Sequence, residues 1–293
     1  MSQSVKKAVT IQDISCKGKC SITVALPILS AMGIDTAVLP TALLSNHTGF
    51  NDFFVHDLSS DFTPITNQWK KQGFSFDAIY TGYLGTESHV DHVKEFVKDF
   101  KRDDTLLIVD PAMADEGKMY SGISPSFASS MHKLIKGSDV ILPNLTEASF
   151  LLGEDLFHKE YTEEDVISIL KDLSNLGATK IVLKGISFSR DQKSLKGIKG
   201  KIGNVTYDST RERITWHFHK KINQSFCGAG DVFASSLTGA LLRGTSLEEA
   251  ISISGDFVLE SIKKTMEEED YSTLYIDFEK ALPWLMKRIG LLS

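Results

Sequence analysis

The chain is poor in cysteine, with three in 293 residues, and this scarcity excludes a disulfide framework as the source of its stability. Long apolar runs are also missing: the segment SITVALPILSAMG contains Pro27 and is too short to cross a bilayer. The first residues, MSQSVKKAVTIQDI, show neither a long apolar stretch nor a small-residue cleavage site, so we expect no signal peptide. These absences predict a cytoplasmic protein with no membrane partner.

An excess of positive charge is absent as well. The 32 Lys and Arg residues are outnumbered by 38 Asp and Glu residues, and the net charge of -6 argues against a general nucleic-acid surface. Phosphate ligands are still compatible with this charge, because backbone amides and a metal ion bind them without a basic patch. Two nucleotide-binding motifs, G-x-x-x-x-G-K-[ST] and a spaced G-x-G-x-x-G with a following ribose acid, are missing too. A P-loop kinase and a dinucleotide enzyme are therefore disfavoured.

Short apolar segments alternate with helical ones through most of the chain. The expected strands are 7–14, 35–44, 77–85, 105–111, 139–144 and 179–185. The expected helices are 20–33, 86–100, 162–177, 228–244, 246–268 and 276–290. This alternation predicts an α/β protein with a mainly parallel sheet and helices on both faces. No repeat or linker divides it, so we expect a single domain over 1–293.

One segment breaks this rhythm. Residues 201–221 read KIGNVTYDSTRERITWHFHKK, with alternating residues on either side of a polar turn, and predict an antiparallel hairpin. Two roles are open for this hairpin: a flap near a nucleotide, or an edge strand at an interface.

Polar residues gather where the expected strands end. In an open parallel sheet, ligands bind beyond the carboxyl ends of the strands, and a strand has no structural need for polar residues there. The residues concerned are Asp13, Thr81, Tyr83, Asp110, Asn144, Glu147 and Lys184. Their convergence predicts a binding site at this edge.

The motif GAGD opens a further expected helix at the same edge. Gly228 and Gly230 allow a ligand to approach the backbone, and the exposed amides of a helix N-terminus favour an anion. Asp231 stands where an acid can take the proton of an attacking hydroxyl. An Asp helix cap beside turn glycines fits the motif equally well.

Two more acids favour phosphoryl transfer. Asp110 in VDPAMAD and Glu147 in LPNLTEA would lie at the ligand edge, where they could hold Mg²⁺ directly or through water. Taken singly, Asp110 fits a strand-ending turn, and Glu147 fits the first turn of a helix. All three acids at one edge shift the balance toward function.

In spacing and order, GAGDVFA, VDPAMAD, LPNLTEASFLLG and YTGYLG resemble the ribokinase-like superfamily. The segment ALLSNHTGF narrows the resemblance to its pyridoxal and pyridoxamine (vitamin B6) kinase branch. It runs from about Lys7 to beyond Gly244 and implies a ribokinase-like three-layer sandwich. It also implies ATP-dependent phosphorylation of the primary 5′-hydroxyl of pyridoxal, pyridoxamine or pyridoxine.

The resemblance also implies catalytic residues. Asp231 would accept the proton of the substrate hydroxyl, and the amides of Gly228, Ala229 and Gly230 would form an anion hole for the phosphoryl group. The family's motif is most often GTGD, so Ala229 keeps the amide but loses a hydroxyl contact.

The nucleotide and metal residues implied by the resemblance are Asp110, Asn144, Glu147 and Lys184. Asp110 and Glu147 would serve Mg-ATP, with Asn144 near the phosphates, whereas Lys184 follows the strand whose end touches the nucleotide. A monovalent-cation requirement stays open. Relatives are commonly homodimers, which implies the same assembly here.

The vitamer ring would lie among Asp13, Thr48, Tyr83 and Cys227. Tyr83 can stack on the ring, while Asp13 or Thr48 can bond to its polar substituents. Asp13 stands where many pyridoxal kinases have Ser, so its charge could favour an amine or a protonated ring nitrogen. Cys227 could contact the ring or add reversibly to the pyridoxal aldehyde, although simple packing fits it as well. Two alternatives remain for the whole chain: a hydroxymethylpyrimidine kinase, and a non-catalytic vitamer-binding protein.

Overall fold

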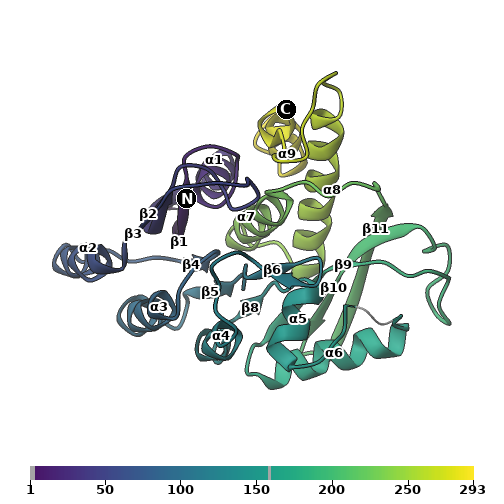
Figure 1. Cartoon of the computed structure of the whole chain (residues 1–293), viewed down its shortest axis with the longest axis horizontal. Helices are drawn as coiled ribbons and strands as arrows, with labels where there is room; N and C mark the ends of the chain where they lie inside the picture. The colour runs from purple at the N-terminus through teal and green to yellow at the C-terminus, as the bar shows by residue number, and fades with distance from the viewer. Residues whose placement is uncertain (1–3, 158–159) are drawn as a thin grey trace.

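The computed structural model describes residues 4–157 and 160–293. In this part of the chain, nine strands form one sheet in the order β11-β10-β9-β8-β5-β4-β1-β2-β3 (Figure 1). The strands are β1 (Lys7–Ser15), β2 (Asp35–Leu44), β3 (Val55–Asp57), β4 (Ala78–Thr81), β5 (Leu106–Val109), β8 (Val140–Ile141), β9 (Lys180–Ile186), β10 (Lys201–Asp208) and β11 (Arg213–Lys220).

The centre of this sheet is parallel and its edges are antiparallel. Strands β2, β1, β4, β5, β8 and β9 pair in parallel, whereas β3, β10 and β11 run against their neighbours. Parallel neighbours need a crossover connection, and helices supply it here. The expected parallel sheet and the expected hairpin are both confirmed.

Helices cover both faces of the sheet, as Figure 1 shows. One face packs against α2 (Ser59–Lys71), α3 (Glu87–Phe100), α4 (Phe127–Ile135), α5 (Leu145–Leu152) and α6 (Glu163–Asn175). The other packs against α1 (Ile22–Ala31), α7 (Ala229–Leu242), α8 (Leu247–Thr265), η1 (Phe278–Ala281) and α9 (Leu282–Arg288). This is the predicted three-layer α/β sandwich. Among the described residues, no helix is both long enough and apolar enough to span a bilayer.

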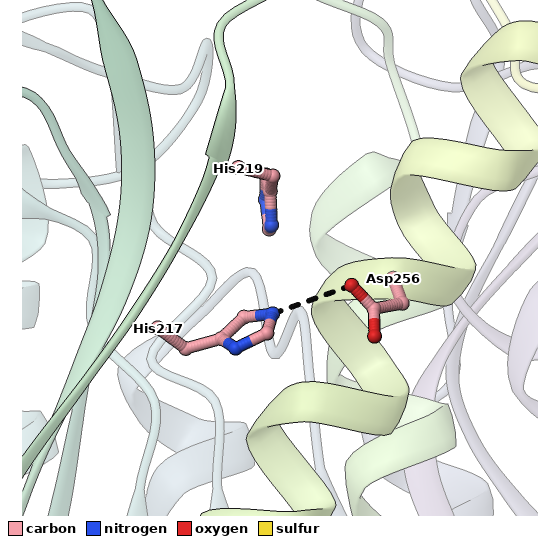
Figure 2. Close-up of side chains that lie close together, drawn as sticks. All are labelled: His217, His219 and Asp256. Atoms are coloured by element: carbon pink, nitrogen blue, oxygen red, sulfur yellow. Dashed lines mark ion pairs between the residues drawn. The ribbon is translucent and has the colours of Figure 1, made fainter. Parts of the chain in front are cut away.

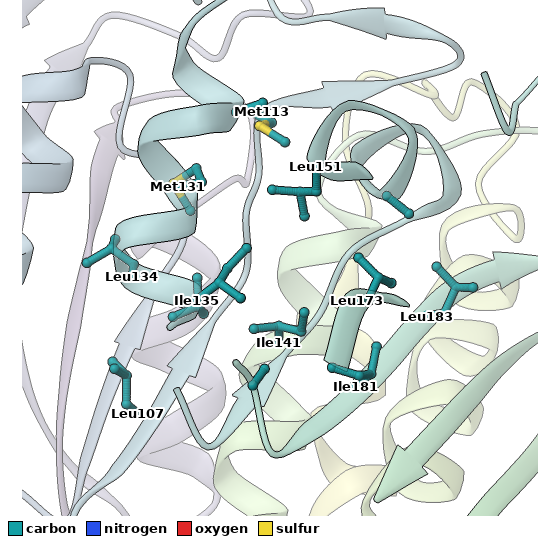
Figure 3. Packing of buried hydrophobic residues seen from close by; sticks show 14 of the residues in the cluster. Leu107, Met113, Met131, Leu134, Ile135, Ile141, Leu151, Leu173, Ile181 and Leu183 are labelled. Carbon is teal, nitrogen blue, oxygen red and sulfur yellow. The ribbon is translucent and has the colours of Figure 1, made fainter. Parts of the chain in front are cut away.

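The two layers of helices give the protein two apolar cores. Successive strand residues point to opposite faces, so Ile79 enters one core and its neighbour Tyr80 the other. Figure 3 shows part of the first core, where Leu107, Ile141 and Ile181 of the strands face the helices. Because both faces are covered, the central strands are apolar at nearly every position.

Sequence reasoning differed from the structure in several places. It missed strand β3, and the predicted helix 276–290 is the 3-10 helix η1 followed by α9. The predicted helix 20–33 begins at Ile22, because Ser21 has a positive φ of 55° and cannot belong to a helix. Sequence analysis also missed α4 and the short hairpin formed by β6 (Ala114–Asp115) and β7 (Lys118–Met119). Strands of two residues carry too little alternation to be recognised.

The central strands should dominate stability. Ile79 is fully buried in β4, so Ile79→Ala leaves a cavity in the first core and should cost about 2–5 kcal/mol of unfolding free energy. Urea denaturation measures this cost. The control Val5→Ala removes methyl groups from a side chain that is 61% exposed and should change the value by less than about 0.5 kcal/mol. Equal effects of the two substitutions would contradict the packing described here.

Candidate active site

A pocket of about 360 Å³ opens at the carboxyl ends of the parallel strands. It gathers residues from segments far apart in the chain. Of the predicted site residues, those that line it are Asp13, Thr48, Tyr83, Asp110, Asn144, Glu147, Lys184, Cys227, Gly228, Gly230 and Asp231. Ala229 lines an adjoining cavity instead, and Thr81 is fully buried in β4 and lines neither cavity.

Helix α7 places Asp231 in the pocket. Its N-cap, Gly228, has a positive φ of 83°, and a Cβ there would lie 2.3 Å from the carbonyl oxygen of Lys19. A glycine is therefore required, and it lets the helix begin with Asp231 in its first turn. The backbone N–H of Ser21 donates to Asp231 Oδ2 at 3.0 Å, so the carboxylate is fixed by a residue 210 positions away.

The surroundings of Asp231 change its acidity. Burial raises its pKa to about 7, and the nearby carboxylates of Asp110 and Asp13 act in the same direction. The Ser21 amide and the Lys184 ammonium oppose this rise. A carboxylate with a pKa near 7 is suited to accept a proton at neutral pH.

Lys184 and Asp110 form a buried ion pair beside Asp231. Lys184 lies in β9 and Asp110 directly follows β5, and the Nζ atom is 2.9 Å and 3.1 Å from the two carboxylate oxygens. Asp110 is 3% exposed. A pair this well buried needs its partners, because an unpaired charge there would be costly.

Glu147 and Asn144 form a capping box at the start of α5. Asn144 Oδ1 accepts the Glu147 amide at 2.8 Å, and Glu147 Oε2 accepts the Asn144 amide at 2.8 Å. The other oxygen of Glu147 accepts the Met113 amide at 3.2 Å. Burial, assisted by Asp110, raises the pKa of Glu147 to about 7, while Lys184 opposes the rise.

The three predicted anion-hole amides are not equivalent. The Ala229 amide donates to the Phe226 carbonyl at 3.3 Å, and Ala229 lines the adjoining cavity. Gly228 and Gly230 line the main pocket. These two glycines therefore present the backbone nearest to a ligand there.

The same pocket contains the predicted ring-binding residues. Asp13 is 2% exposed and accepts a hydrogen bond from Ser15 Oγ at 2.8 Å, and burial raises its pKa. Burial likewise raises the pKa of Tyr83 to about 12, so its hydroxyl is neutral. Burial also raises the pKa of Cys227, which keeps the thiol protonated at neutral pH.

His47 shapes the loop that carries Thr48. Its Nε2 lies 2.6 Å from the Leu274 carbonyl oxygen, and its Nδ1 accepts the Gly49 amide at 3.0 Å. With Nδ1 as acceptor and Nε2 as donor, both ring nitrogens are occupied. His47 therefore holds the SNHTG loop against the loop before η1.

Sequence reasoning missed several residues that line the pocket: Ser15, Cys20, Ser21, Asp115 and Tyr120. Ser21 acts through its backbone, for which the sequence has no signal. Tyr120 enters through the missed β6–β7 hairpin.

A second cavity, of about 250 Å³, adjoins the first and shares Asp115, Lys184 and Gly230 with it. Residues of the hairpin and of α8 line it, among them Ile202, Gly203, His219, Val258 and Ile262. The hairpin therefore forms both the edge of the sheet and a wall of this cavity.

Known proteins resemble the chain over almost its whole length. The sequence profile of the family described as phosphomethylpyrimidine kinase matches residues 24–274. A pyridoxine kinase of Bacillus subtilis is 25% identical over 276 residues, which cover 92% of this chain and 94% of that protein.

Solved structures agree with this assignment. A Bacteroides thetaiotaomicron protein described as a phosphomethylpyrimidine kinase, in a crystal form with pyridoxal, has 35% identity and a TM-score of 0.89, with 96% of each chain covered. Pyridoxal kinase from Lactobacillus plantarum has 27% identity and a TM-score of 0.84, with 97% of this chain and 98% of that chain covered.

Fold and relatives together define a ribokinase-like kinase, a phosphotransferase with an alcohol group as acceptor. Within this class, the chain belongs to the family described as phosphomethylpyrimidine kinase, and its relatives confirm the vitamin B6 kinase branch indicated by the sequence motifs.

The raised pKa of Asp231 predicts a pH-dependent cost in stability. Because its folded pKa, about 7, exceeds the ordinary 3.8, its contribution to stability is complete below about pH 4 and is lost as the pH rises through 7. Asp231→Asn has no such loss, so its stability relative to wild type should rise by about 2–4 kcal/mol between pH 4 and pH 8. Urea denaturation at the two pH values measures this difference.

Asp165→Asn is the matched control. The Thr162 backbone and hydroxyl lower the pKa of Asp165, so its contribution is present above about pH 4 and is lost at lower pH. The unfolding free energy of this variant, relative to wild type, should therefore not increase between pH 4 and pH 8. If Asp231→Asn behaved in the same way, the assigned environment of Asp231 would be wrong.

Proposed function

We propose that this kinase transfers the γ-phosphoryl group of ATP to the primary 5′-hydroxyl of pyridoxal, pyridoxamine or pyridoxine. The main support is the convergence of Asp231, the Lys184–Asp110 pair and the SNHTG loop on one pocket. Relatives with the printed names pyridoxine kinase and pyridoxal kinase support the substrate class.

Asp231 is the proposed base. Its Oδ2 already accepts the Ser21 amide, so we assign Oδ1 as the atom that takes the proton of the substrate hydroxyl. The pKa of about 7 leaves part of the carboxylate ionised at neutral pH and makes it a better proton acceptor than an ordinary aspartate. Positioning and charge stabilisation supply the rest of the rate.

The phosphoryl group is proposed to lie over the start of α7. Gly228 is the N-cap of α7 and Gly230 lies in its first turn, where the helix dipole favours negative charge. Lys184 can exchange part of its contact with Asp110 for a phosphate oxygen. Together these donors would stabilise the charge that the transferred group carries.

The charge of the pocket suits a Mg-nucleotide. Lys184 is the one Lys or Arg among the described residues that line it, against five acids: Asp13, Asp110, Asp115, Glu147 and Asp231. This excess of carboxylate fits a divalent cation. Asp110 and Glu147 would hold Mg²⁺, Glu147 through water because backbone amides occupy both its oxygens. The ion would neutralise the phosphates.

The second cavity is the proposed place of the nucleotide base. It adjoins the main pocket at Lys184 and is lined by apolar side chains of α8 such as Val258 and Ile262. The side-chain amide of Asn144 donates a hydrogen bond from Nδ2 to the carbonyl oxygen of Ala114 at 2.8 Å. This bond fixes the loop between the two cavities.

The vitamer ring is proposed to lie between Asp13 and Tyr83. The buried carboxylate of Asp13 favours a protonated ring nitrogen or an amine, and Thr48 supplies a hydroxyl. Cys227 keeps a neutral thiol, which suits contact with the ring better than addition to an aldehyde. A homodimer stays a prediction of the resemblance, a cytoplasmic location and a single domain over 1–293 stay predictions of the sequence, and the monovalent-cation requirement stays open.

Hydroxymethylpyrimidine is the second candidate substrate, because the matching family is described as phosphomethylpyrimidine kinase. It too has a hydroxymethyl group on an aromatic ring. The Bacteroides thetaiotaomicron protein of the same description was solved with pyridoxal, which favours a vitamer.

A kinetic panel separates these alternatives. With Mg-ATP, we expect kcat/KM to be at least about tenfold higher for one of pyridoxal, pyridoxamine and pyridoxine than for hydroxymethylpyrimidine, because Asp13 and Thr48 match the vitamer's ring substituents. Coupled ADP release measures all four rates. A preference for hydroxymethylpyrimidine would support the second candidate. Vitamer binding without turnover would identify a non-catalytic binding protein.

Asp231→Asn should remove the base while keeping the shape of the site. Since Asn can still accept the Ser21 amide, we expect ATP affinity to stay within about twofold and kcat to fall about 10²–10⁴-fold. Steady-state kinetics and calorimetric titration of ATP give the two values. Turnover at the wild-type rate would rule out Asp231 as the base.

A further inference from the structure

A second group of chemically active side chains lies outside the main pocket, between β11 and α8. His217 and His219 project from the strand toward the helix, and Asp256 of α8 faces His217 (Figure 2). One ligand atom from each residue can be chosen so that all three lie within 4.8 Å of one another. His217 Nε2 and Asp256 Oδ1 are 3.4 Å apart.

The placement of the two histidines is unusual for a covered strand. In β11, Ile214, Trp216 and Phe218 pack against the first apolar core, so the alternate residues point toward α8. A face covered by a helix is ordinarily apolar. Here it presents two imidazole rings, with centroids 5.4 Å apart, to a carboxylate.

Both rings have a nitrogen without a hydrogen-bond partner. Among the described residues, His217 Nε2 and His219 Nδ1 are buried atoms for which no aligned donor or acceptor is present. Leaving a buried nitrogen unpaired costs free energy, so His219 Nδ1 points to an absent partner, whereas His217 Nε2 has the Asp256 carboxylate as an ion-pair neighbour at 3.4 Å.

The helix is shaped to admit these rings. A Cβ at Gly255 would lie 2.9 Å from His219 Cε1 and 3.1 Å from His217 Cδ2, so a larger residue would push both rings away. One turn before Asp256, Ser252 donates its hydroxyl to Asp256 Oδ2 at 3.3 Å. This hydrogen bond orients the carboxylate, as outer-shell partners do for metal ligands.

We propose that His217, His219 and Asp256 bind a divalent transition-metal ion of the zinc class, with water or a ligand in the fourth position. Two imidazoles and a carboxylate suit Zn²⁺, whereas Mg²⁺ and Ca²⁺ prefer all-oxygen sites. Ligands of one tetrahedral ion lie about 3.3 Å apart, so the widest separation must close by about 1.5 Å, which side-chain rotation can supply.

The position of the site between two elements also supports it. The ion would join edge strand β11 to α8, which also contact each other beside the second cavity through His219 and Gly255. The inference concerns metal binding alone and stands independently of the kinase reaction proposed above.

Titration of the metal-free protein with Co²⁺ tests the site in the absence of ATP and Mg²⁺. We expect one equivalent to bind and to give the visible spectrum of a tetrahedral nitrogen and oxygen site, and Zn²⁺ to displace it. His217→Gln, His219→Gln and Asp256→Asn should each weaken binding at least about tenfold. A sulfur-to-cobalt charge-transfer band would instead assign the ion to cysteine and overturn the proposal.

Two control variants should bind Co²⁺ as tightly as the wild-type protein does. Glu260→Gln removes a carboxylate one turn further along α8, and His56→Gln removes an exposed histidine of β3. If either control weakened binding as much as the site variants, or if wild type bound no ion, the proposal would fail.

Two measurements on the wild-type protein test the site even if the variants do not fold. Zn²⁺ in excess should raise the thermal midpoint of the wild-type protein by a few degrees, since it binds the folded state. In an NMR spectrum of the imidazole nitrogens, Zn²⁺ should shift the resonances of two histidines over the same range of metal concentration. A spectrum unchanged by Zn²⁺ would refute the site without any substitution.

Discussion

The ion pair between Lys184 and Asp110 is the interaction on which the chemistry of this protein depends. It joins β9 to β5 across the short strand β8, at the point where the parallel strands end. Asp110 raises the pKa values of both Asp231 and Glu147, while Lys184 opposes the rise at each. Burial is the main cause of these raised pKa values, and the balance between the two charges adjusts them and governs how readily a phosphate can replace one contact of the lysine.

This arrangement costs stability and serves function. Two carboxylates with pKa values of about 7 are ionised at high pH against the preference of the fold. The large apolar cores on both faces of the sheet offset that cost, and rigid elements hold the acids in position. Gly228 contributes to the same arrangement, because only a residue without a side chain allows the Lys19 carbonyl to approach the start of α7 this closely. Strain and unusual protonation gather at the ligand edge, as they do at many active sites.

Much of the fold and part of the site could be predicted from the sequence. The alternation of segments such as 35–44 and 162–177 indicated parallel strands and crossover helices, because these periods reflect burial directly. The NLTE segment predicted a helix start, and the structure confirms a capping box there. Short elements such as β6 escaped prediction, and so did Ser21, since a backbone amide contributes no side-chain signal.

The sequence by itself determined the order of the elements and the residue types at the strand ends, because local propensity and burial period depend on neighbouring residues. Only the tertiary structure decided which of those residues meet. Asp110 and Lys184 are 74 positions apart, and Ser21 and Asp231 are 210 apart. His217 and His219 likewise find Asp256 only because β11 and α8 pack together. Such contacts depend on strand order and helix rotation, which no short segment of the chain specifies.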